Sequence, residues 1–422
     1  MRILLIHQNY PGQYKHIGPA LVAEGHEVFA LCMNIKTARI WSGVKVFPYV
    51  VSGSSTKGIH PWIIDFETNV LRGEAVFHAA RELDRRGFRP DIILAHPGWG
   101  EAMFIKDVWP DARLGLYCEL YHLNNPEFVN FDPEFMLPLE TDPLRLRLKN
   151  LNNHLHFEIA DAGISPTHFQ ADTFPQSFRD QISVIHDGID TKQVRPNPEA
   201  RFRVNDKLCL SRSDEVITFV NRNFEPYRGY HIFMRALPGI LARRPDAQVL
   251  LLGGDQVGYG AAPVKGSSKQ IFIDEVRHKI PDADWQRVHF LDPVPYDQFL
   301  TLLQVSRVHI YLTYPFVLSW SMLEAMSTEC AILASNTGPV RDVLQEGKTG
   351  YLVDFFDIDA LTNRLCDLLD DPQTRARLGR AARQYIQKHF DLKTVCLPRQ
   401  LEWVTRLSTL PVQRLKPRVR TY

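Results

Sequence analysis

Short apolar runs recur along the whole chain, and they constrain its fold more than any other feature of the sequence. Each is rich in Leu, Ile or Val and does not alternate with polar residues, which is typical of strands buried on both faces of a parallel sheet. We expect such strands at Ile3–Ile6, Glu27–Leu31, Asp91–Ala95, Arg113–Tyr117, Ile182–Ile185, Val216–Val220, Gln248–Leu252, Arg307–Leu312 and Ala331–Ala334. Amphipathic segments lie between them, as at Leu71–Arg86, Tyr230–Arg243 and Asp359–Leu369. This alternation predicts an α/β protein with doubly wound parallel sheets.

The series of strands is interrupted once. Residues 190–213 are polar, contain Pro and hold no clean apolar run, and a new series begins at Val216. A chain of 422 residues is long enough for two domains of about 200 residues each. We therefore expect Rossmann-like domains at 1–195 and 214–395, with a C-terminal helix and tail at 396–422 that returns to the first domain. The carboxyl ends of the two sheets can then face one cleft.

Charge and cysteine usage exclude several classes of protein. The formal net charge is +1, whereas a nucleic-acid-binding protein usually carries a larger basic excess. The six cysteines are scattered without a Cys-x-x-Cys pair, as expected of reduced thiols in the cytosol. No apolar run approaches the length of a membrane span or a secretory signal. We expect a cytoplasmic protein, with peripheral contact to the inner membrane face left open.

Two arginines flank a short loop after one predicted strand, in the sequence VNRNFEPYRGYHIF at residues 220–233. Gly229 permits a tight turn before the next helix. Guanidinium groups offer bidentate donors to a diphosphate and neutralise the charge that builds on a leaving group. A solvated loop with two surface arginines is the alternative. Arg222 and Arg228 are therefore candidate catalytic residues.

A second segment favours the diphosphate site. Residues 311–335 predict a strand, a Pro-containing loop, a helix that starts near Ser319 or Ser321, and another strand. Amides at such a helix start bind anions, so we expect Ser319, Trp320 and Ser321 at the donor site. Glu324 lies one turn inside the helix, where its carboxylate can accept hydrogen bonds from both ribose hydroxyls. Its alternative role is to stabilise the N-terminal part of the helix.

In these two segments the chain resembles the retaining glycosyltransferases of family four, which have the GT-B fold. Their Arg, short loop and basic residue before Gly are similar to Arg222 and Arg228-Gly229, with Arg where Lys is usual. The matching segments are Leu323-Glu324-Ala325-Met326, Ala334–Val340, Gly350–Val353 and the turn at residues 184–191. The resemblance implies transfer of a sugar from a nucleotide-diphosphate sugar, of UDP or GDP type, to a glycan or lipid-linked acceptor. Polysaccharide biosynthesis is the implied setting.

One position departs from the family pattern. The family usually has a second Glu eight residues before Glu324, where it contacts hydroxyls of the transferred sugar, and this chain has Phe316 there. The departure leaves the donor sugar open. It also keeps a catalytically silent nucleotide-sugar or glycan-binding protein as an alternative. A sugar-nucleotide epimerase on the same fold would need a paired acid and base, and a dinucleotide oxidoreductase would need a GxGxxG motif that is missing after both opening strands.

Polar residues follow the predicted strands of the N-terminal half as well. Gly12 permits a close backbone approach after the first strand, and the resemblance places a Gly-containing loop here over the donor diphosphate, so Gly12 and Gln13 are candidate donor-binding residues. His96 and Trp99 follow the strand at Asp91–Ala95 and could line an acceptor pocket, because an aromatic face suits a sugar ring. A packed helix start is the alternative reading.

The strand at Arg113–Tyr117 leads into Glu119 and His122. Family members often have a catalytic-site His at the end of this strand, and by position that slot falls on Glu119. As a base near neutrality Glu119 would permit an inverting route. The resemblance favours retention, in which the acceptor attacks on the leaving-group face and the departing phosphate oxygen takes the proton. Such a route depends on charge stabilisation.

We expect no metal and no other cofactor. The acidic pairs Asp282-Ala-Asp284 and Asp357-Ile-Asp359 resemble the DxD motif of metal-dependent glycosyltransferases, but neither follows a strand of the N-terminal domain. Residues 144–157 predict one helix whose buried face carries Leu144, Leu148, Leu151 and Leu155, with an interfacial helix as the alternative.

Overall fold

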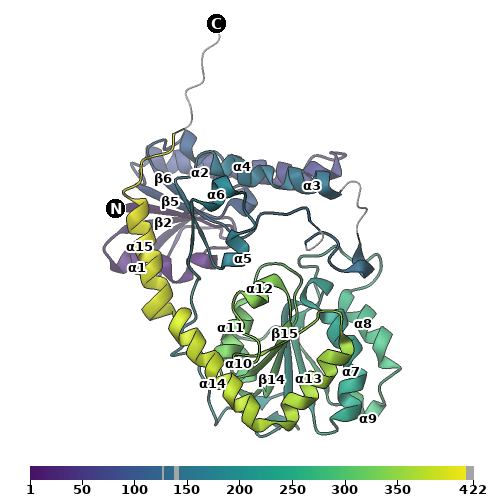
Figure 1. Ribbon diagram of the computed structural model, residues 1–422. Helices are drawn as coiled ribbons and strands as arrows, with labels where there is room; N and C mark the ends of the chain where they lie inside the picture. The colour runs from purple at the N-terminus through teal and green to yellow at the C-terminus, as the bar shows by residue number, and fades with distance from the viewer. Residues whose placement is uncertain (126–127, 137–141, 415–422) are drawn as a thin grey trace. The chain divides into compact units, whose positions relative to one another are not determined.

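A computed structural model describes residues 1–125, 128–136 and 142–414. The chain forms two compact units, of which the first comprises Met1–Asp187 and the residues from Lys393 onward, and the second comprises Gly188–Leu392 (Figure 1). Each unit holds its own mainly parallel sheet, which confirms the predicted fold class. Residues 190–213 belong to the second unit. The tail beyond residue 414 lies outside the described residues.

The sheet of the first unit has eight strands in the order β3-β4-β2-β1-β5-β6-β7-β8. All neighbours are parallel except β3 and β4. The strands are β1 (Arg2–Ile6), β2 (Glu27–Cys32), β3 (Arg39–Trp41), β4 (Val44–Pro48), β5 (Ile92–Ala95), β6 (Arg113–Tyr117), β7 (Ala162–Ser165) and β8 (Ile182–Val184). The five strands predicted in this half are confirmed.

Helices cover both faces of this sheet because successive residues of its strands point to opposite sides. Ile3 and Leu5 of β1 share one apolar cluster with Leu21 and Trp403, whereas Leu4 and Ile6 pack in another cluster. The helices are α1 (Ile17–Ala23), α2 (Ile64–Arg85), α3 (Asp142–Lys149), α4 (Leu151–Phe157), α5 (His168–Ala171), α6 (Gln176–Arg179) and α15 (Leu397–Leu407). The C-terminal helix α15 packs beside α1 and β6 (Figure 1).

Shorter helical turns complete the first unit. They are η1 (Gly12–Lys15), η2 (Pro61–Ile63), η3 (Pro97–Trp99), η4 (Ile105–Asp107) and η5 (Pro133–Phe135), and the turn η7 (Leu392–Cys396) precedes α15.

The predicted helix at residues 144–157 is wrong in two respects. It is divided into α3 and α4 at Asn150, and the expected apolar face is not the buried one, since Leu144 and Leu151 are exposed. The side chains of Asn150 and Asn152 are buried instead. Asn150 exchanges two hydrogen bonds with the backbone of His122, at 3.0 and 2.7 Å. These amides are buried because they satisfy backbone groups of neighbouring loops.

The second unit has a six-stranded parallel sheet in the order β13-β12-β11-β14-β15-β16. Its strands are β11 (Val216–Asn223), β12 (Gln248–Gly254), β13 (Val288–Leu291), β14 (Val308–Tyr311), β15 (Ala331–Ser335) and β16 (Tyr351–Val353). The short antiparallel pair β9 (Phe202–Arg203) and β10 (Cys209–Leu210) lies in the stretch predicted to hold no strand. The four strands predicted for the sheet are confirmed.

Helices also cover both faces of the second sheet. They are α7 (Tyr230–Arg243), α8 (Ser268–Arg277), α9 (Asp282–Trp285), α10 (Tyr296–Val305), α11 (Trp320–Ser327), α12 (Gly338–Arg341), α13 (Ile358–Asp370) and α14 (Pro372–His389), with the turn η6 (Pro226–Arg228) before α7. Phe219 of β11 stacks on Phe233 of α7, with 4.6 Å between ring centroids. Val216 and Val220 point to the opposite face and pack with Met322 and Met326 of α11. This doubly wound arrangement leaves the loops at the carboxyl ends of the strands available for binding.

Candidate functional site

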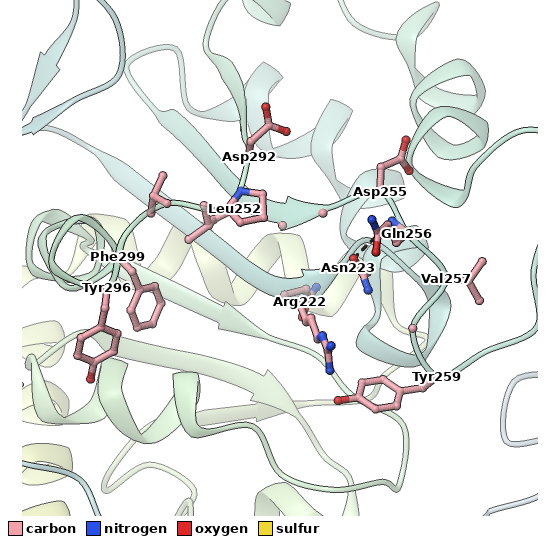
Figure 2. Close-up of a pocket in the computed structure, with 16 residues that line it drawn as sticks. Arg222, Asn223, Leu252, Asp255, Gln256, Val257, Tyr259, Asp292, Tyr296 and Phe299 are labelled. Carbon is pink, nitrogen blue, oxygen red and sulfur yellow. Dashed lines mark hydrogen bonds between the residues drawn. The ribbon is translucent and has the colours of Figure 1, made fainter. Parts of the chain in front are cut away.

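A pocket of about 900 Å³ lies in the second unit at the carboxyl ends of β11, β12 and β13. Figure 2 shows Arg222 and Tyr259 on one side of the pocket and Tyr296 and Phe299 on the other. The loop between β12 and α8 contributes Asp255–Tyr259 to the wall. In open parallel sheets this edge is where ligands bind.

Arg222 is an uncommitted cation in this pocket. It lies near the end of β11, and its side chain is exposed and extends toward the ring of Tyr259 (Figure 2). Among the described residues it has neither a hydrogen-bond partner nor an ion-pair partner. Its full set of N–H donors is therefore available to an anionic ligand.

Arg228 is a buried cation that the protein holds in place. Its side chain is 5% exposed. The Nη1 group donates to Thr313 Oγ1 at 2.8 Å and to Val317 O at 2.9 Å, and more weakly to the Tyr311 hydroxyl at 3.3 Å. Gly229 is required next to it, since its φ is +67° and a Cβ would lie 2.2 Å from the Cβ of Leu312. The Nη2 and Nε groups remain as donors for a ligand.

The start of α11 is connected to Arg228 through Tyr311. The hydroxyl oxygen of Tyr311 accepts from Ser319 N at 2.9 Å as well as from Arg228. Ser319, one of the two predicted helix starts, is the N-cap of α11, and its hydroxyl accepts from Ser321 N at 3.3 Å. Trp320 is exposed. The helix start thus follows closely on the loop that holds the Arg228 guanidinium.

Glu324 reaches the pocket wall through a tyrosine. It is 8% exposed, and its Oε1 accepts from the hydroxyl of Tyr296 at 2.5 Å. Tyr296 itself lines the pocket. Burial, and next the charge of Glu324, raise the pKa of Tyr296. The structure therefore brings Arg222 and the Tyr296–Glu324 pair to one pocket.

Phe316 lies beside Arg228. The guanidinium carbon is 5.5 Å from the Phe316 ring and 5.2 Å from the Tyr259 ring. The two ring centroids are 4.8 Å apart. The Phe316 ring thus stands at the sequence position where the family resemblance would place a carboxylate.

In the first unit, Gly12 and Gln13 form a tight turn against His7. A Cβ on Gly12, whose φ is +45°, would lie 2.4 Å from the His7 ring. Asn9 N donates to Nδ1 of His7 at 3.0 Å, so the proton is on Nε2, which donates to Gln13 Oε1 at 2.6 Å. Burial, and next the neighbouring His96, lower the pKa of His7 to about 4. Neutral His7 therefore orients the Gln13 amide group.

His96, Trp99 and Glu119 also meet at the carboxyl edge of the first sheet. The rings of His96 and Trp99 stack with 4.1 Å between centroids, and Trp99 contacts His7 edge-on at 4.9 Å. Gly98 N donates to Nδ1 of His96 at 3.0 Å, which places the proton on Nε2, and Nε2 lies 3.5 Å from Glu119 Oε2. The sequence-predicted residues of β1, β5 and β6 thus form one cluster.

His122 has different surroundings. Its backbone pairs with Asn150, and burial, followed by the charges of Lys149 and Arg145, lowers the pKa of its side chain to about 3.

Sequence reasoning missed two residues of these two sites, His7 and Tyr296. His7 had a signal, because it follows a predicted strand directly, as His96 does. Tyr296 had none, since its role depends on a contact with Glu324, which lies far from it in the sequence.

Three of the four carboxylates in the two acidic pairs have structural roles. Asp282 pairs with Arg277, Asp284 with Arg287 at 2.7 Å, and Asp357 is the N-cap of α13. In the described part of the chain, no helix is both long and apolar enough to cross a membrane.

Two family models match the chain. The model described as Glycosyl transferase family 4 group matches residues 24–194, and the model described as Glycosyl transferases group 1 matches residues 205–385. The first match lies almost wholly in the first unit and the second lies in the second unit.

Curated relatives match about half of the chain. It is 28% identical over 219 residues to D-inositol 3-phosphate glycosyltransferase of Corynebacterium glutamicum (strain R), covering 51% of this chain and 48% of that protein. It is 25% identical over 267 residues to a GDP-mannose-dependent alpha-(1-6)-phosphatidylinositol monomannoside mannosyltransferase of Mycolicibacterium smegmatis, covering 61% and 64%. The chain spans about half the length of the first curated relatives that it matches.

Solved structures match nearly the whole chain. Sucrose-phosphate synthase from Thermosynechococcus elongatus has a TM-score of 0.73 at 18% identity, with 96% of this chain and 98% of that chain covered. HepE of Anabaena in complex with UDP-glucose has a TM-score of 0.66 at 15% identity, with 96% and 99% covered. At these identities the likeness concerns the fold.

Proposed function

Since the chain belongs to the glycosyl transferases of family 4, we propose that it moves a hexose from a nucleotide-diphosphate sugar to a glycan or lipid-linked acceptor. The proposal is supported first by Arg222, an uncommitted guanidinium in a pocket of about 900 Å³ at the carboxyl edge of a parallel sheet. A cation without a protein partner in such a pocket favours a phosphate ligand.

We assign the two sides of the pocket to the two ends of the nucleotide. Arg222 and the free edge of Arg228 bind the diphosphate. The Tyr296–Glu324 pair lies toward the other side and binds the ribose, with the carboxylate accepting from ribose hydroxyls once Tyr296 moves or shares the bond. The printed names of similar proteins support both UDP and GDP as the nucleotide, because one relative is GDP-mannose-dependent and one structure holds UDP-glucose.

Transfer is proposed to proceed with retention and without a metal. The acceptor hydroxyl attacks the anomeric carbon on the face of the leaving group, the bond to the β-phosphate oxygen breaks, and that oxygen takes the acceptor proton. Charge builds on the diphosphate during this step, and two guanidinium groups stabilise it where a divalent cation would otherwise be needed. Glu119, paired with His96, is proposed as a contact of the acceptor or the donor sugar.

Thermal shift and turnover measured together test this proposal. UDP-, GDP-, TDP- and ADP-sugars are compared with NAD, with and without EDTA, and with candidate acceptors. We expect one class of nucleotide sugar to stabilise the protein and to be turned over equally with EDTA. Stabilisation by NAD alone would refute the proposed donor, and loss of turnover in EDTA would refute the metal-free route.

A catalytically silent binding protein is the second candidate. The observation that favours it is Phe316, which lies beside Arg228 and offers no acceptor to sugar hydroxyls. Nucleotide-sugar binding without hydrolysis or transfer, over the same panel of acceptors, would select this alternative.

A further inference from the structure

Two aromatic rings border the Arg228 guanidinium, and they come from different parts of the second unit. Phe316 lies in the loop between β14 and α11, and Tyr259 lies in the loop between β12 and α8. Their centroids are 4.8 Å apart at an interplanar angle of 58°. Tyr227 supports the Phe316 ring edge-on at 5.6 Å. The rings therefore form a continuous aromatic surface beside a cation that we assign to the diphosphate.

A buried carboxylate holds Tyr259 in this position. Glu225 is 4% exposed, and its Oε2 accepts from the backbone N–H groups of Tyr259 and Gly260, at 2.8 and 3.1 Å. The other oxygen packs against Gly258, where a Cβ would lie only 2.3 Å from Glu225 Oε1. Charge-assisted bonds to two successive amides fix the backbone on both sides of the Tyr259 side chain.

We propose that Tyr259 and Phe316 form the seat of the donor sugar and that Glu225 is the positioning residue that keeps this seat assembled. The inference rests on the proposed function, because the sugar of such a donor is joined to the β-phosphate by a single oxygen. A β-phosphate on Arg228 places the sugar against the groups that border Arg228, and those groups are aromatic.

The chemistry of the seat defines what it recognises. A phenyl ring offers no lone pair to a hydroxyl, so a hydroxyl directed at Phe316 would lose its hydrogen bonds to water without replacement. The C–H face of a pyranose loses nothing on contact with a ring and gains dispersion and electrostatic attraction to the π face. The donor sugar therefore turns a C–H face to Tyr259 and Phe316, and its hydroxyls point elsewhere.

Comparing the affinity for a sugar donor with that for its free nucleoside diphosphate separates the contribution of the sugar from that of the nucleotide. Dissociation constants are measured by calorimetry for UDP and UDP-glucose, and for GDP and GDP-mannose, on the full chain. In Phe316→Leu and Tyr259→Leu we expect the tighter-binding sugar donor to lose about 5- to 10-fold in affinity, a loss typical of one aromatic stacking contact. The free diphosphate should change by less than about twofold, because Nη1 of Arg228 keeps its three acceptors in these variants and so holds the guanidinium in place. Tyr259→Phe, which keeps the ring, is the control and should bind like the wild type.

Two further variants test the positioning role of Glu225. Glu225→Gln removes the charge that holds the loop, and Gly258→Ala forces the loop away without altering the carboxylate. Each should weaken sugar-donor binding as Tyr259→Leu does, and the double variant Glu225→Gln with Tyr259→Leu should be no weaker than Tyr259→Leu alone. Additive losses would show that Glu225 acts elsewhere and would overturn the positioning role.

Failure of the sugar seat and failure of the proposed function give different experimental results. The sugar seat is overturned if Phe316→Leu and Tyr259→Leu lose equal affinity for a diphosphate and its sugar donor, or lose affinity for neither. In that case diphosphate binding by the wild type still upholds the proposed donor class. Absence of diphosphate binding by the wild type would overturn the proposed function and the sugar seat with it.

Discussion

Replacement of Arg228 by Lys should be costly, even though both side chains are cations of similar reach. Nη1 of Arg228 already donates to Thr313, Val317 and Tyr311. Nη2 and Nε then leave three N–H groups for a ligand. An ammonium group has only three N–H donors in all, so a lysine at this position must satisfy either the buried acceptors or the diphosphate.

The size of the effect follows from these contacts. Hydrogen bonds to charged groups contribute about 1.5–3 kcal/mol each, and a buried acceptor left without a donor costs about 1–3 kcal/mol. If the introduced ammonium group serves the protein, ligand affinity falls by one or two such bonds, which is about 10- to 100-fold for a free diphosphate. If it serves the ligand, the free energy of unfolding falls by about 1–3 kcal/mol. A smaller loss of ligand affinity should therefore accompany a larger loss of stability, and the reverse.

Arg222→Lys is the matched control. Arg222 has no protein partner among the described residues, so its replacement should leave the free energy of unfolding unchanged within about 0.5 kcal/mol. Affinity for the diphosphate should fall only about 3- to 10-fold, because the charge remains and the bidentate fork is lost. Calorimetry with UDP and GDP gives the affinities, and urea unfolding without ligand gives the stabilities. The reasoning is refuted if Arg228→Lys has wild-type affinity and wild-type stability, or if the two variants show equal losses of affinity and of stability.

Three further predictions concern stability. Lys106→Met should lower the free energy of unfolding of the first unit by about 3–5 kcal/mol in urea, because it leaves the buried Asp161 carboxylate without its cation. Arg85→Met, which removes an exposed ion pair, is the control and should change this free energy by less than about 1 kcal/mol. Similar losses for both variants would contradict the prediction. Gly229→Ala should lose about 2 kcal/mol or more, since φ is +67° and the added Cβ would meet Leu312; an unchanged midpoint would disprove the constraint. Acid should destabilise the first unit more than the second as the pH falls from about 6.5 toward 4, because unfolding then releases buried neutral imidazoles that take up protons, at about 1 kcal/mol per pH unit for each histidine. Hydrogen exchange resolved by unit, compared at pH 7 and pH 5, measures this difference, and equal losses would contradict it; the described histidines with a lowered pKa are His7, His122, His156 and His186 in the first unit and His289 and His309 in the second.

The strands could be predicted because a strand that is buried on both faces of a sheet has an unbroken run of apolar residues in its sequence. Val216–Val220 and Ala331–Ala334 are examples, and both are strands of the second sheet. β7 was missed because Ala162–Ser165 contains only one large apolar residue. β3 and β4 form an edge pair in which polar residues are tolerated, so they lack the same signature.

The helix at residues 144–157 shows where periodicity fails. Spaced leucines predicted an apolar buried face, but Leu144 and Leu151 are exposed while Asn150 is buried. Apolar spacing records only the hydrophobic part of the free energy. It carries no information on a backbone group elsewhere, such as the amide and carbonyl of His122, that a side-chain amide must satisfy.

In the candidate site, too, the sequence predicted the residue types but not their contacts. In the sequence, Arg222 and Arg228 are two equivalent cations at the end of a strand, and spacing alone assigns them one role. The structure separates them, since Arg228 is buried and bonded to three acceptors whereas Arg222 is exposed and lines the pocket without a partner among the described residues. A rigid cation is pre-organised for a charge that develops at one point, and an unrestrained one can follow a ligand as it enters and leaves. Arg228 should therefore contribute to the chemical step as well as to donor binding, and Arg222 to donor binding alone, so that Arg228→Lys lowers kcat and raises KM for the donor while Arg222→Lys mainly raises KM.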